Sequence, residues 1–72
     1  MNESLFIKSI ADITDIEGEI TMDTILNDLE EWDSLSIVSF IAFVKSNGIS
    51  DVTVGEVREA KTVRDLYGFV KS

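Results

Sequence analysis

The longest apolar stretch of the chain runs from Ile37 to Val44 and is interrupted only by Ser39. This stretch is far too short to cross a bilayer, so it has to be buried against the rest of a 72-residue chain. The chain has no cysteine, so no disulfide can support what must be a small core. We therefore expect a single domain over residues 1–72, organised around a helix that contains this stretch.

Start and stop signals place that helix over residues 34–46. Asp33 and Ser34 are both good N-cap residues, and the dipeptide Asn47-Gly48 is typical of a helix end. Lys45 in the last turn suits the helix dipole. At this stage the N-cap can be either Asp33 or Ser34.

At helical spacing this segment has a wide apolar arc and a serine-rich sector. The arc comprises Leu35, Ile37, Val38, Phe40, Ile41, Ala42 and Val44. The remaining sector holds Ser36, Ser39 and Ser46, with Phe43 among them. Two interpretations of Phe43 stay open. Its ring either packs under a loop or forms a contact patch with Leu35 and Ala42 beside Ser34.

Three further helices are expected around the central one. Asn2 can cap a helix over residues 3–13, whose apolar arc is Phe6, Ile7, Ile10 and Ile13. Capping boxes that begin at Thr53 and Thr62 predict a short helix over residues 54–60 and a last helix that ends near Val70. A short strand around Val52 and Val54 is the weaker alternative. The predicted fold is all-α, a small four-helix bundle with three main helices and a short third helix.

Residues 14–24 read as a long polar loop between the first two main helices. Three apolar side chains are expected to attach it to the core: Ile16, Ile20 and Met22. Its acids invite a calcium interpretation, but Thr14 and Ile16 stand where an EF-hand loop needs acids or amides. We expect a solvated acidic loop, with a short turn anchored by Leu26 and Leu29 after it.

The charge pattern excludes several classes of function. The net charge of −8 argues against nucleic acid and anionic membranes as partners. Residues 1–33 hold ten acids and a single base, a net −9, whereas residues 34–72 hold four acids and five bases, a net +1. The N-terminus lacks the basic region of a signal peptide, so we expect a cytoplasmic protein without membrane insertion.

Histidine is absent as well as cysteine. The chain therefore lacks the commonest general base and metal ligand, and it cannot form Ser-His or Cys-His pairs. We expect neither an enzyme nor a metal site.

Several motifs together are similar to those of a known family. They are Leu29 followed by Trp32-Asp33-Ser34-Leu35, then Ile49 after Asn47-Gly48, and Thr62-Val63 with Asp65-Leu66. On these motifs the chain resembles the acyl carrier protein family, the phosphopantetheine-binding four-helix domains, over nearly its whole length. Acidity, length, the missing cysteine and the long first loop agree with that resemblance.

The resemblance implies that Ser34 carries a covalent 4′-phosphopantetheine arm, added from coenzyme A by a phosphopantetheinyl transferase. The arm would carry acyl or aminoacyl groups as thioesters between a loading enzyme and an accepting enzyme, in lipid or secondary-metabolite biosynthesis, on a monomeric carrier. Asp33 is expected to help in the transferase complex. Partner recognition is assigned to Asp33, Leu35, Ser36, Ala42 and Phe43.

The sequence departs from the fatty-acid type of carrier in one respect. The first acid after Ser34 is Asp51, so the central helix lacks the acids that basic partner enzymes read. This favours a specialised carrier, and an aminoacyl, D-alanyl or peptidyl cargo is one alternative. The other alternative is an unmodified helical adaptor that binds its partner through Leu35 and Phe43.

Overall fold

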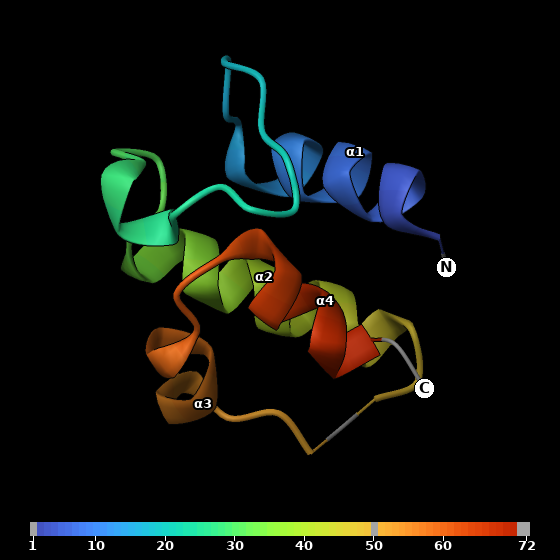
Figure 1. Cartoon of the computed structure of the whole chain (residues 1–72). Coiled ribbons are helices and arrows are strands. Elements are labelled where there is room, and N and C mark those ends of the chain that lie inside the picture. The colour runs from blue at the N-terminus through green and yellow to red at the C-terminus, as the bar shows by residue number, and fades with distance from the viewer. Residues whose placement is uncertain (1, 50, 71–72) are drawn as a thin grey trace.

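The computed structural model describes residues 2–49 and 51–70, and Met1, Ser50, Lys71 and Ser72 lie outside the described residues. The elements, in order, are α1 (Glu3–Thr14), the 3-10 turn η1 (Leu26–Asp28), α2 (Ser34–Ser46), α3 (Val54–Glu59) and α4 (Val63–Val70). The predicted four-helix bundle with a short third helix is confirmed (Figure 1). No strand forms around Val52 and Val54, because Thr53 caps α3 there.

The predicted caps account for where the helices begin. The Asn2 side chain accepts the N–H of Leu5 at 2.8 Å and starts α1. Thr53 and Glu56 form both hydrogen bonds of a capping box at α3. At α4 the Asp65 carboxylate accepts the N–H groups of Lys61 and Thr62 at 2.9 and 3.2 Å. These bonds satisfy amides that a helix start would otherwise leave unpaired.

The core is built on aromatic contacts between α1 and α2. Phe6 and Phe40 are fully buried, and their ring centroids lie 6.3 Å apart in an edge-to-face arrangement. Every other aromatic residue of the chain contacts one of these two rings: Trp32, Phe43, Tyr67 and Phe69. A single aromatic network therefore joins α1, α2, α4 and the segment that precedes α2.

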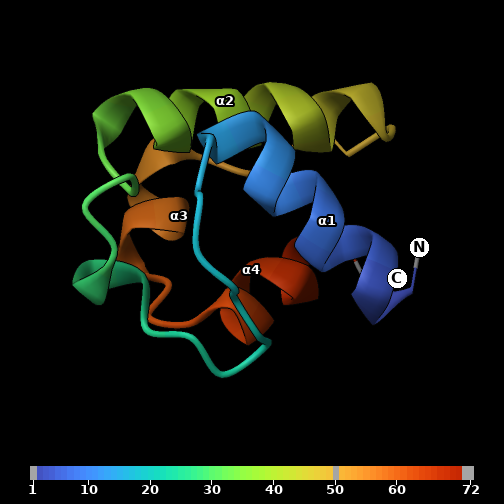
Figure 2. The same ribbon diagram turned by 90° about the horizontal axis from the view of Figure 1, so that it is seen from above.

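The long loop after α1 crosses the bundle and pairs with the start of α4 (Figure 2). Its three predicted anchors are buried, as expected: Ile16, Ile20 and Met22. The carbonyls of Met22 and Thr24 accept the N–H groups of Arg64 and Val63 at 2.8 and 3.1 Å. The loop thus caps the first turn of α4 with its own backbone, which the sequence pattern did not predict.

The buried face of α2 is narrower than the predicted apolar arc. Its buried residues are Ser36, Ile37, Phe40 and Val44. Leu35 is 74% exposed and Val38 57% exposed, and Ala42 is also exposed. The apolar arc extends beyond the buried face at this edge because α1 packs against the side of α2 that carries Ser36 and Phe43. The opposite edge is left to solvent.

We expect Phe40→Ala to lower the free energy of unfolding by about 3–5 kcal/mol, because it removes the ring that most of the aromatic network contacts. Urea denaturation measures this loss. The matched control on the same helix is Val38→Ala, whose side chain is 57% exposed and whose loss should stay within about 0.5 kcal/mol. Equal losses in the two variants would contradict this account of the core.

The pKa of Asp65 is lowered, chiefly because its carboxylate accepts the backbone N–H groups of Lys61 and Thr62. A carboxyl whose pKa is lower in the folded state stabilises the fold above its unfolded pKa, and this stabilisation is lost as pH falls through the folded pKa. Asp65→Asn should therefore have a lower melting temperature than wild type at neutral pH. The difference between the two melting temperatures should become smaller as the pH falls well below 3.8, the ordinary pKa of this carboxyl. Thermal melts across pH check this, and a difference independent of pH would contradict it.

Candidate functional site

Ser34 is the first residue of α2, and its side chain is exposed. The N-cap is Asp33, whose carboxylate oxygen Oδ1 accepts the N–H of Ser36 at 3.0 Å. The Ser34 hydroxyl makes no hydrogen bond to another described residue. Of the two N-cap candidates, Asp33 is therefore the one that caps α2, and the exposed Ser34 hydroxyl takes no part in the cap.

The start of α2 also has free amide groups. The N–H of Ile37 donates to the Asp33 carbonyl at 3.0 Å, and the N–H of Ser36 is capped. The N–H groups of Ser34 and Leu35 have no acceptor among the described residues. Together with the helix dipole, they favour a negative group bonded to the Ser34 oxygen.

Basic side chains are missing from this part of the chain. No Lys or Arg lies between Lys8 and Lys45, and both ion pairs found among the described residues involve Arg64, at 4.0 Å from Glu3 and 3.4 Å from Asp23. The segment that leads into Ser34 and α2 itself as far as Lys45 therefore contribute no base that could pair with a phosphate there. No group of three potential metal ligands occurs among the residues that the structure describes.

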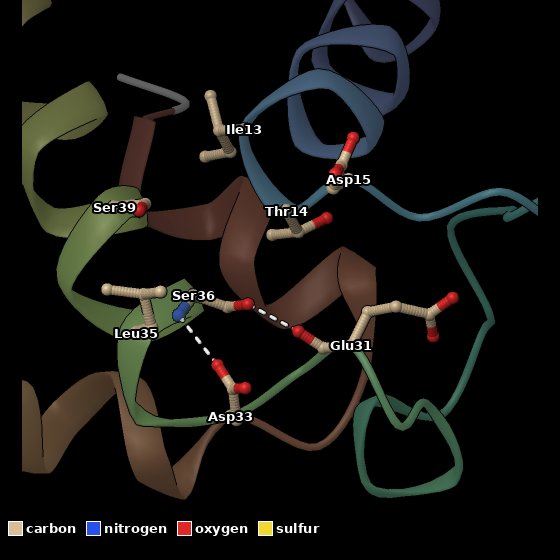
Figure 3. A pocket seen from close by; sticks show the side chains of 8 residues that line it. All are labelled: Ile13, Thr14, Asp15, Glu31, Asp33, Leu35, Ser36 and Ser39. Carbon is tan, nitrogen blue, oxygen red and sulfur yellow. Dashed lines mark hydrogen bonds between the residues drawn. The ribbon is translucent and has the colours of Figure 1, made fainter.

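A pocket of about 320 Å³ lies between the end of α1 and the start of α2 (Figure 3). It is lined by Ile13, Thr14, Asp15, Glu31, Asp33, Leu35, Ser36 and Ser39. Thr14 and Ser36 are buried, and their hydroxyls donate to the carbonyls of Ile10 and Glu31. Ser34 does not line this pocket, which lies on another side of the helix start.

The placement of Ser36 is a correction to the sequence prediction. The helical pattern put Ser36 in a solvent-facing serine sector and made it a partner contact. Its exposed fraction is only 6%, and its hydroxyl donates to the carbonyl of Glu31, as Figure 3 shows. Ser36 is polar yet buried because both its hydroxyl and its amide have an acceptor close by.

The structure divides the other predicted contact residues between two faces of α2. Leu35 and Ala42 are exposed and lie at helical spacing on the solvent face with Ser34. Val38, which the sequence pattern placed in the same apolar arc, is also exposed there. The helical periodicity could not have predicted that Val38 is exposed, because the direction from which α1 packs is set by the fold.

Phe43 fits neither of its two sequence interpretations fully. It is half-buried, and its ring centroid lies 6.4 Å from that of Phe6 and 6.3 Å from that of Phe40. The ring of Phe43 therefore contacts Phe6 of α1 and Phe40 of its own helix, α2. It does not share the solvent face of Leu35 and Ala42.

Comparisons with known proteins add no assignment: no protein-family model, curated protein or solved structure matches the chain. The resemblance to carrier proteins therefore stays a prediction from the motifs. Among the described residues no helix has the length and apolar character needed to span a membrane. The expected compartment also stays a prediction.

Two substitutions on α2 separate its surface from its core. Phe43→Ser should lower the free energy of unfolding by about 1–3 kcal/mol, because it removes a ring from the aromatic network. Leu35→Ser should change it by less than about 0.5 kcal/mol, since Leu35 is 74% exposed. Chemical denaturation of both variants measures the difference. A larger loss at Leu35 than at Phe43 would contradict the orientation of α2.

Proposed function

We propose that the chain is a carrier protein that bears a 4′-phosphopantetheine arm on Ser34 and delivers acyl or aminoacyl groups to partner enzymes. The observation that carries the proposal is the free, exposed hydroxyl of Ser34 at the first residue of α2. A serine that neither caps its helix nor bonds to a neighbour has no evident structural role at this position. The sequence around it, Trp32-Asp33-Ser34-Leu35, resembles the attachment motif of carrier proteins.

The proposed attachment joins the Ser34 oxygen to a phosphorus atom of coenzyme A. A phosphoester bond forms at Ser34, the pyrophosphate bond of coenzyme A breaks, and adenosine 3′,5′-bisphosphate leaves. The hydroxyl proton passes to a base of the transferase, since the chain has no histidine and Asp33 serves as the N-cap of α2. The free N–H groups of Ser34 and Leu35 would then favour the phosphate.

When bound, the arm supplies a thiol, which this cysteine-free chain lacks. The residues of the chain itself hold and present the arm. Ser34 bears it, and the solvent face of α2 around it is available to partner enzymes. That face is apolar at Leu35, Val38 and Ala42 and has no acid. Its character supports a specialised carrier, whose cargo is an acyl group or, as the alternative, an aminoacyl, D-alanyl or peptidyl group.

Modification by a broad-specificity phosphopantetheinyl transferase tests the proposal directly. Wild-type chain with coenzyme A and magnesium should gain the mass of one phosphopantetheine, and Ser34→Ala should gain nothing. Intact-mass spectrometry reads both. The absence of a gain in wild type, or a gain that persists in Ser34→Ala, would overturn the proposal.

A second candidate function is an unmodified helical adaptor. It is favoured by one observation, the exposure of Leu35 and Val38, because large apolar side chains on a surface often anchor a partner. Chain isolated from its native host separates the two functions. The adaptor would be supported if the native chain lacks the added mass, and if partner binding is kept in Ser34→Ala and lost in Leu35→Ser.

A further inference from the structure

We infer that Ser36 is a positioning residue for the modification of Ser34. Its buried hydroxyl and its amide hold the first turn of α2 against the segment before it, and so hold in place the backbone from which the Ser34 side chain projects. This inference rests on the proposed function. It concerns a residue that the sequence pattern placed on the surface.

Ser36 makes two hydrogen bonds back across Ser34. Its N–H donates to the Asp33 carboxylate at 3.0 Å, and its hydroxyl donates to the carbonyl of Glu31 (Figure 3). Residues 31–36 are thus closed into a ring that contains Ser34. Because the Ser36 side chain is only 6% exposed, water competes little for the bond that its hydroxyl donates.

The segment before this ring is anchored separately. The N–H of Trp32 donates to the carbonyl of Leu29 at 3.2 Å, and its ring centroid lies 6.4 Å from that of Phe40. Trp32 therefore attaches the segment before Ser34 to the core, and Ser36 attaches the same segment to the first turn of α2. Removal of the Ser36 hydroxyl would leave the exposed cap at Asp33 as the remaining side-chain bond across Ser34.

Ser34 depends on these neighbours because its own side chain has no tether among the described residues. The position of its oxygen is set by the local backbone and by free rotation about χ1. A misplacement of about 1 Å in a reacting group can cost about 100-fold in rate. A looser backbone at residues 31–36 should therefore slow the attack of Ser34 without preventing the transferase from docking.

The test compares rates of phosphopantetheine transfer, followed by intact mass at several carrier concentrations. Ser36→Ala should lower the transferase kcat at least about tenfold, with KM for the carrier changed less than about twofold. Ser36→Thr keeps the hydroxyl at a position that lines the pocket, so it should restore a rate near wild type. Ser39→Ala, on the same pocket wall one turn later, is the matched control and should react like wild type.

Each outcome bears on the inference. If wild type gains no mass, the proposed function fails and the inference fails with it. If wild type is modified and Ser36→Ala reacts as fast, the function stands and the inference is overturned. A rise in KM alone, or an equal loss in Ser39→Ala, also overturns it.

A structural effect is excluded by working well below the melting temperature of each variant, with circular dichroism as the check. Should Ser36→Ala not fold, Ser36→Cys takes its place, since a thiol has similar shape but is a weaker donor. If Ser36→Cys reacts at the wild-type rate, the inference is overturned. If its kcat is lower than that of wild type, the inference is supported. As a readout independent of activity, the amide NMR signals of Ser34 and Leu35 should shift or broaden in Ser36→Ala and stay unchanged in Ser39→Ala.

Discussion

The edge-to-face contact between Phe6 and Phe40 is the interaction on which the rest of the structure depends. A chain of 72 residues buries little surface, and this one has no disulfide to restrict its unfolded state. The two rings join the N-terminal part of α1 to the centre of α2, and they are in turn contacted by the rings of α4 and by Trp32. The same contact fixes the rotation of α2 about its axis, and with it the side that faces solvent.

That rotation decides the character of the candidate site. With Phe40 against Phe6, Ser36 turns toward the end of α1, and Ser34 stays on the outside with Leu35 and Val38. An exposed serine and a buried serine thus lie two positions apart on one helix turn. The acids of the chain are concentrated before Ser34 in the sequence, and α2 has none. Three of them, Asp15, Glu31 and Asp33, line the same pocket as Leu35. A partner would therefore meet an acidic edge and an apolar face at the same place.

Local signals in the sequence predicted much of this fold. Asn2, Asp33, Thr53 and Thr62 were readable as helix starts because a cap needs only a short side chain and an amide two or three positions away. The buried loop anchors were readable because apolar residues in a polar loop need somewhere to pack. The exposure of Val38 and the burial of Ser36 were not readable. Both depend on the direction from which α1 approaches, and periodicity along one helix carries no information about its neighbours.

Trp32 has a consequence of another kind. It is the only tryptophan of the chain, it lies two residues before Ser34, and its ring packs against Phe40. The same indole therefore belongs both to the core and to the segment that leads into α2. Its intrinsic fluorescence needs no label. It reports on whether the segment before Ser34 is packed against Phe40 in the core.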